Sequence, residues 1–142
     1  MPYTQSPAPN VGITIILDGR GSRQYYPSET LAGSYRFDSV GGDDIKALEV
    51  SVLWQTEGKG NTDLGVHAFW RWETAAGDWI DPRHPGRFNT ILPASPLSYN
   101  GIIVKINWCI RVRLFLENGQ QVVEELPFWL GNVPDVRTLR YS

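Results

Sequence analysis

The stretch IIVKINWCIRVRLFL, residues 102–116, decides the fold because apolar residues occupy every second position along it. The apolar positions are Ile102, Val104, Ile106, Trp108, Ile110, Val112, Leu114 and Leu116. A helix turns about 100° per residue and would scatter these side chains, whereas a strand turns about 180° and gathers them on one face. The stretch therefore predicts one long β-strand with its apolar face on a core.

The sequence ENGQ, residues 117–120, predicts that this strand turns back in a β-hairpin. Its central Asn-Gly pair tolerates the positive φ angles of a two-residue turn. The residues placed opposite each other would be Leu114 and Val123 on the core face, and Arg113 and Glu124 on the solvent face. Because this register would also bury Glu125 opposite Val112, we expect a bulge at residues 124–125.

Similar alternation predicts further strands at residues 13–17, 31–37, 48–54, 64–72 and 87–92. In the fourth of these windows the parity places Leu64 and Val66 on the core face and His67 on the polar face. Glycine- and aspartate-rich turns separate the strands, and no segment has helical periodicity. Seven or eight strands therefore predict an all-β fold, an antiparallel two-sheet immunoglobulin-like β-sandwich.

The length of 142 residues is typical of one domain. Residues 1–10 hold three prolines and no periodicity, so they predict a flexible N-terminal arm before a single domain over residues 11–142. The one cysteine, Cys109, excludes an intrachain disulfide. It falls on the polar parity of the long strand, where it either faces solvent or lies covered as a small hydrophobe.

The net charge and the hydropathy of the chain limit the kinds of partner that we expect it to bind. The net charge is −2 and no block of Lys or Arg exceeds two residues, which disfavours nucleic acid and anionic membranes as main partners. The sequence begins without a basic, apolar leader, and no apolar run reaches the length of a membrane span. We therefore expect no integral membrane segment and a cytoplasmic location.

Two segments resemble the arrestin-type family, which includes retromer-subunit-like domains. The segment QYYPSETLAG, residues 24–33, is similar to a Tyr-, Pro- and Glu-containing segment near the start of arrestin-type domains. The segment FNTILPASPLSYNGIIVKINWCIRVRL, residues 88–114, resembles their Leu-Pro segment and the long strand after it. Both occur in the family's order, and with the strands between them they cover most of residues 11–130.

This resemblance implies an arrestin-like sandwich that acts as a non-enzymatic adaptor or scaffold, binding other proteins through sheet faces, edges and loops. Ser28 stands where the family usually has glycine. The chain also holds one sandwich, whereas arrestins and their retromer-type relatives have two in tandem. No switch mechanism is carried over to this chain.

The stretch LPASPLSYNG, residues 92–101, is interpreted as a crossover between the two sheets. Pro93 and Pro96 cannot donate ladder hydrogen bonds, so they end one strand before the next begins. Ser95 or Ser98 can hydrogen-bond nearby backbone in the turn.

No catalytic motif is visible. The two histidines, His67 and His84, have no recognisable nucleophile beside them in sequence, and G-x-S-x-G is absent. The acidic residues near Asp43 and Asp63 lie in turns, where aspartate is common for backbone reasons. We therefore expect no enzyme activity, no catalytic residue, no cofactor and no metal.

The tryptophan residues are the basis for an alternative hypothesis about function. Parity places four of them in the core: Trp54, Trp70, Trp72 and Trp108. Trp79, in GDWIDP, is the best candidate for an exposed aromatic side chain. Exposed aromatic rings stack on sugars in carbohydrate-binding modules, so such a module is the alternative to an adaptor.

The other candidate partner-binding residues lie at the polar positions of the long strand and are Lys105, Asn107, Arg111 and Arg113. One interpretation is a solvated sheet face with cross-strand ion pairs. The other is a groove for an anionic peptide, because the arginine fork suits carboxylate and phosphate. The main hypothesis is a protein-interaction module whose partner is another protein or a second copy of the chain.

Overall fold

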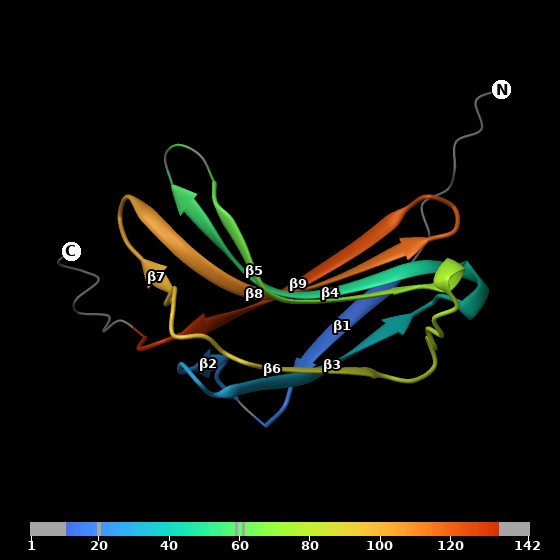
Figure 1. Ribbon diagram of the computed structural model, residues 1–142, viewed down its shortest axis with the longest axis horizontal. Coiled ribbons are helices and arrows are strands. Elements are labelled where there is room, and N and C mark those ends of the chain that lie inside the picture. The colour runs from blue at the N-terminus through green and yellow to red at the C-terminus, as the bar shows by residue number, and fades with distance from the viewer. Residues whose placement is uncertain (1–10, 20, 59, 61, 134–142) are drawn as a thin grey trace.

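Strands make up almost all of the regular structure in the computed structural model, which describes residues 11–19, 21–58, 60 and 62–133 (Figure 1). The strands are β1 (Gly12–Leu17), β2 (Gln24–Tyr25), β3 (Thr30–Asp38), β4 (Ile45–Gly58), β5 (Leu64–Glu73), β6 (Gly86–Ile91), β7 (Tyr99–Asn100), β8 (Val104–Leu116) and β9 (Gln121–Leu130). Two short 3₁₀ helices are η1 (Gly42–Asp44) and η2 (Thr74–Ala76). The predicted arm, residues 1–10, lies outside the described residues, as do residues 134–142 of the predicted domain.

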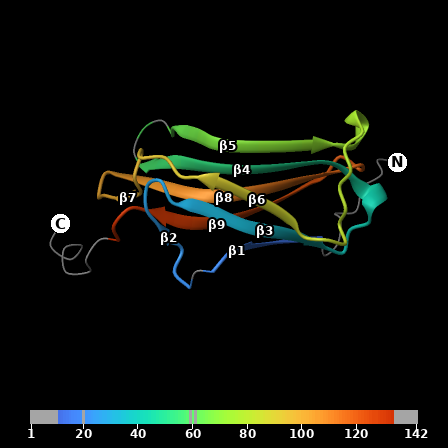
Figure 2. The same ribbon diagram turned by 60° about the horizontal axis from the view of Figure 1, so that its bottom comes forward.

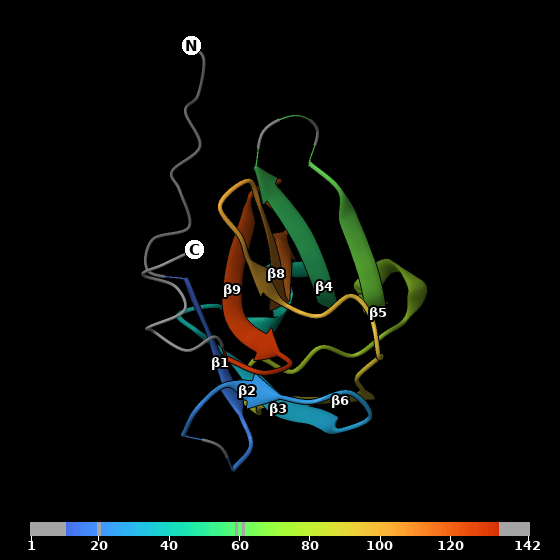
Figure 3. The same cartoon turned by 90° about the vertical axis from the view of Figure 1, so that its left-hand side faces the viewer.

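The strands form two packed sheets. The small sheet has the order β1-β3-β6, and the large sheet has the order β2-β9-β8-β4-β5, with β7 paired to β8. Figure 3 shows the two layers, and Figure 2 shows that their strands run along the long axis of the molecule. Within the described residues seven strands have six or more residues, which confirms the predicted all-β two-sheet sandwich. One pair departs from the antiparallel pattern, since β2 runs parallel to β9.

The core lies between the sheets and follows the predicted parity of the long strand. From Trp108 onward the inward residues of β8 are buried: Trp108, Ile110, Val112, Leu114 and Leu116. Val104 and Ile106 share their parity, but Val104 is exposed and Ile106 is only half-buried, so the predicted core face is wrong at the start of the strand. They pack with inward residues of β1, β3 and β4 in one cluster. Trp54, Trp70 and Trp72 are partly buried against this cluster, so all four tryptophans assigned to the core contact it.

The long strand begins two residues later than predicted. β8 starts at Val104, and Ile102 and Ile103 are 83% and 77% exposed. The cause is β7, which pairs with β8 as a short hairpin and makes residues 101–103 its turn. The Gly101 N–H donates to the Val104 carbonyl at 3.0 Å and closes that turn.

The predicted register between β8 and β9 is wrong by one residue. The Leu116 N–H donates to the Gln120 carbonyl, so the turn holds three residues instead of two, with Gly119 at a φ of 89°. The resulting pairs are Leu114 with Val122, Arg113 with Val123, Val112 with Glu124 and Arg111 with Glu125. This pairing runs without interruption, so no bulge forms at residues 124–125. Glu124 shares the parity of the core but is exposed, because β9 is the sheet edge there.

A bulge occurs instead in β5 and reverses the predicted facing of its first half. Val52 pairs with Ala68, but the next residue, Leu53, pairs with Val66, which leaves His67 without a partner in the ladder. The polar-face prediction for His67 is therefore wrong. Its ring reaches inward, and Nε2 lies 2.9 Å from the Ile91 carbonyl oxygen in β6. The extra residue turns Leu64 and Val66 away from the core.

Residues 92–98 carry the chain from β6 in the small sheet to β7 in the large sheet, as the proline-rich stretch predicts. This crossover also completes the core. The indole N–H of Trp108 donates to the Pro96 carbonyl at 2.8 Å. The Leu130 N–H donates to Ser98 Oγ at 2.7 Å, which ties the crossover to the end of β9.

Candidate functional site

The face of the large sheet that points away from the small sheet, here called the outer face, gathers four of the five predicted partner-binding residues. Lys105, Asn107, Arg111 and Arg113 share one parity of β8, opposite to that of its core residues. β4, β5 and β8 bend away from the small sheet toward their ends, whereas the C-terminal end of β9 runs down to β2, and the outer face formed by these strands is concave (Figure 1). The strand that organises the core therefore also forms the middle of a curved surface.

The floor of the outer face is buried although it points away from the core. Leu53 and its cross-strand neighbour Cys109 are 1% and 8% exposed. Ser51 is buried beside them. A hollow of about 520 Å³ lies on this face and is bordered by Asn107 and Glu125. The curved sheet thus has a small apolar floor at its centre, a feature that strand parity does not predict.

Ion pairs cross the outer face between adjacent strands. Arg111 Nε in β8 lies 2.6 Å from Glu125 Oε2 in β9. Arg71 in β5 pairs with Glu49 in β4, and its Nε lies 2.6 Å from Glu73 Oε1. The hydrogen bond to Glu73 is the main cause of the raised pKa of Arg71. The predicted pair between Arg113 and Glu124 is wrong, because the one-residue shift places these residues on opposite faces.

Arg113 differs from the other arginines of the outer face. In the described part of the chain it makes no ion pair, and its Nε is buried without a hydrogen-bond partner. Its Cζ lies 6.0 Å from the centroid of the Phe115 ring, and Arg71 Cζ lies 5.2 Å from the same centroid. One aromatic ring therefore holds two guanidinium groups by cation–π contact, and Arg113 keeps donors free for a partner.

Apolar residues of β5 extend the outer face to the sheet edge. Leu64, Val66 and Phe69 are each about half exposed. The parity analysis missed Leu64 and Val66 because it assumed an unbroken strand, and the bulge at His67 is not visible in the alternation. The outer face therefore combines a covered floor, charged cross-strand pairs and an apolar border.

Cys109 shows no sign of a reactive thiol. Burial is the main reason that its pKa is raised to about 11, and the Glu125 carboxylate adds to this effect. The group is therefore a protonated thiol near neutral pH, which is a poor nucleophile and metal ligand. Of the two interpretations of Cys109, the covered hydrophobe is confirmed.

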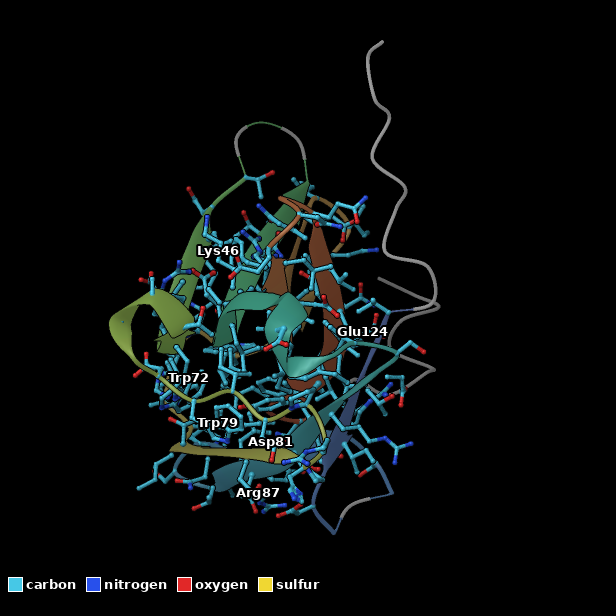
Figure 4. All side chains as sticks on the ribbon, turned by 90° about the vertical axis from the view of Figure 1, so that its right-hand side faces the viewer. Lys46, Trp72, Trp79, Asp81, Arg87 and Glu124 are labelled. Carbon is cyan, nitrogen blue, oxygen red and sulfur yellow. The ribbon has the colours of Figure 1, made fainter. Side chains whose placement is uncertain are left out.

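Trp79 lies outside the outer face. It belongs to the connection between η2 and β6, at one end of the sandwich, and is 76% exposed as predicted (Figure 4). Beside it a cavity of about 270 Å³ opens between the two sheets, bordered by Tyr35, Trp72, Asp81 and Arg87 among others. Trp79 and the outer face are thus two separate candidate sites.

No group of three or more His, Cys, Asp or Glu side chains in the described residues is arranged to hold a metal ion. None of the helices there is both long and apolar enough to cross a membrane.

Comparison with known proteins identifies the type of fold. No protein-family model matches the chain, and no curated protein matches it. Among solved structures it is similar to Spo0M, a sporulation control protein from Bacillus subtilis, with a TM-score of 0.60 and 13% identity over 92% of this chain. The chain covers 53% of Spo0M, about half of its length. Because Spo0M has an arrestin-like fold, the likeness shows a β-sandwich of arrestin type.

A second similar structure comes from another kind of protein. Superoxide reductase (neelaredoxin) from Ignicoccus hospitalis matches with a TM-score of 0.53 and 8% identity, over 85% of this chain and 82% of that one. At these identities both likenesses concern the fold alone. A control protein and an enzyme share the sandwich, so function must be argued from the surface.

Proposed function

We propose that this domain is a non-enzymatic protein-interaction module, an adaptor or scaffold, and that a protein partner or a second copy of the chain docks on its outer face. The observation that carries the proposal is the hollow of about 520 Å³ on the concave sheet, with Cys109 buried on its floor and Leu53 buried beside Cys109 in the next strand. An apolar centre with a polar rim is the usual anatomy of a protein interface.

Charged groups of the outer face, in the hollow and beyond it, give the docked partner its orientation. Glu125 borders the hollow and is engaged by Arg111, while Glu49 lies outside the hollow and is engaged by Arg71. Arg113 has free donors, and its guanidinium is held against Phe115. A carboxylate or phosphate of the partner placed on Arg113 would gain a charge-assisted, bidentate hydrogen bond. Arg113 is therefore the residue assigned to anion recognition, while Lys105 and Asn107 contact the partner at the end of β8.

A cytoplasmic location belongs to the same proposal. The single cysteine has no partner for a disulfide in this chain, and it is buried as a thiol. Such cysteine use fits a reducing compartment.

Site-specific photo-crosslinking tests the proposal. A benzoylphenylalanine placed at Asn107 is expected to crosslink one protein, or a second copy of the chain, in the source cell. The matched control is the same group at Asn89, an exposed asparagine on the outward side of the small sheet. A crosslink that forms equally from Asn89, or from neither position, would overturn the proposal.

Carbohydrate binding is the second candidate function, and one observation favours it. Trp79 exposes 76% of its surface beside a cavity with further aromatic walls. A glycan array tests this candidate, since binding that disappears in Trp79→Ala would support it.

A further inference from the structure

The cavity beside Trp79, here called the loop-side cavity, lies between the two sheets under the connection that joins η2 to β6. Residues from both sheets and from that connection border it: Tyr35, Phe37, Leu48, Trp72, Trp79 and Asp81. Figure 4 shows Trp72, Trp79, Asp81 and Arg87 on the same end of the molecule. Its volume of about 270 Å³ is at the small end for ligand sites, which suits one ring and not an extended chain.

Tyr35 brings an unpaired hydroxyl group to this cavity. Its residue surface is only 7% exposed, and among the described residues its hydroxyl makes no hydrogen bond. The ring lies against Gly86, where a Cβ would approach Tyr35 Cζ to 2.1 Å, so the side chain cannot turn away through that strand. The hydroxyl oxygen is not itself enclosed, so it is open to the cavity, and a ligand in the cavity can hydrogen-bond to it.

The protonation state of Tyr35 determines which hydrogen bonds its hydroxyl group can make. Burial raises the pKa of Tyr35 above its usual value of 10.0, so the phenol stays protonated at neutral pH. It therefore presents an O–H donor together with acceptor lone pairs. A ligand with a hydroxyl or ether oxygen matches this group.

The charges around the cavity favour a neutral ligand, because each has a partner already. The Arg83 N–H donates to Asp81 Oδ1 at 2.9 Å, and this bond is the main cause of the lowered pKa of Asp81. Arg87 Nη1 lies 3.0 Å from Asp18 Oδ1. His84 Nε2 lies 3.8 Å from Asp81 Oδ2. A charged ligand would have to compete with these pairs, whereas a neutral one would not.

Aromatic surface supplies the remaining contact. Trp79 stands at the edge of the cavity with most of its ring in solvent, and Trp72 borders the cavity from β5. An indole presents a flat π-face and one N–H donor. The apolar C–H face of a sugar ring covers such a surface while its hydroxyl groups remain free to hydrogen-bond.

We propose that the loop-side cavity binds a single neutral sugar ring, the terminal residue of a glycan, with Trp79 stacked on its C–H face and the Tyr35 hydroxyl bonded to one of its oxygens. This inference rests on the second proposed function, carbohydrate binding. It adds the site, the ligand's neutrality and the role of a residue that sequence parity assigns to no function.

The experiment is a glycan array that carries neutral, sialylated and sulfated glycans, followed by calorimetry with the methyl glycoside of the strongest terminal sugar. Binding to neutral termini is expected. Tyr35→Phe, which removes only the hydroxyl, should weaken binding about 3- to 10-fold. Trp79→Ala should weaken it at least about 10-fold. The matched control is Tyr99→Phe, an exposed tyrosine outside this cavity, which should bind as wild type.

The outcomes separate the site from the function. If neutral glycans bind and neither Tyr35→Phe nor Trp79→Ala changes the affinity, carbohydrate binding stands but the loop-side cavity is not the site. If only acidic glycans bind, the inference of a neutral ligand is wrong. If no glycan binds, the second proposed function fails together with the inference. Thermal melts of each variant show whether the fold is kept.

Discussion

His67 Nε2 lies 2.9 Å from the backbone carbonyl oxygen of Ile91, and this hydrogen bond links β5 of the large sheet to β6 of the small sheet. A carbonyl only accepts, so Nε2 carries the proton. The ring also lies edge-on to Trp108, with 6.2 Å between centroids. We predict that His67→Ala lowers the free energy of unfolding by about 1–2 kcal/mol, because it removes this inter-sheet contact.

Urea unfolding measures that loss. The control is His84→Ala, since the His84 side chain is 69% exposed. Its change should stay within about 0.5 kcal/mol of wild type. Equal losses in the two variants would mean that His67 does not hold the sheets together.

The register between β8 and β9 gives a second prediction. A double-mutant cycle on Arg111 and Glu125, whose Nε and Oε2 atoms are 2.6 Å apart, should give a coupling of about 0.2–1 kcal/mol at low salt. The same cycle on Arg113 and Glu124, the pair expected from a two-residue turn, should give none. A larger coupling for the second pair would show that the three-residue turn is incorrect.

Gly65 gives a third prediction, because Trp54 covers it from the neighbouring strand. A Cβ at this position would lie 2.3 Å from the Trp54 ring, so Gly65→Ala forces the indole to move. We expect a loss of about 1–3 kcal/mol in the free energy of unfolding. Gly21→Ala is the control, since nothing lies within 4 Å of its Cβ position. Two variants of equal stability would contradict the close packing of Trp54.

The buried thiol makes stability depend on alkaline pH. The pKa of Cys109 is raised to about 11 from the usual thiol value of 9.0. Between these values the unfolded chain loses the thiol proton while the folded chain keeps it, so the stability contributed below pH 9 is lost as the pH rises toward 11. Wild type should therefore lose stability across this window more steeply than Cys109→Ala. Parallel curves from urea titrations at each pH would show that the thiol is not covered.

The sequence predicts the core better than it predicts the surface. Alternation in β8 identifies Trp108 to Leu116 as one buried face, because the inward residues of a central strand must all be apolar. Alternation cannot reveal the bulge at His67 or the third residue of the β8–β9 turn, since each is a local backbone choice. Each of these changes shifts the chain by one residue, so the side chains beyond it point to the opposite face of the sheet.

The candidate sites, like the strand registers, can be predicted only in part from the sequence. Lys105 to Arg113 could be grouped because one strand carries them, and the exposure of Trp79 follows from its turn-rich surroundings. The floor of the outer face depends on sheet curvature, and the loop-side cavity depends on Tyr35 and Trp72 meeting from different sheets. Such tertiary contacts leave no periodic trace in a single sequence.

The most direct test of the proposed docking surface compares two glutamate substitutions on opposite sides of the sandwich. Phe69 on the outer face and Ile16 on the outward side of the small sheet are both 51% exposed, so they form a matched pair. Affinity for the protein crosslinked from Asn107, or self-association if that protein is a second copy, is measured for each variant. We predict that Phe69→Glu weakens binding at least about 10-fold, by 1.4 kcal/mol or more, while Ile16→Glu leaves it unchanged. Unchanged binding in Phe69→Glu, or a larger loss in Ile16→Glu, would contradict docking on the outer face.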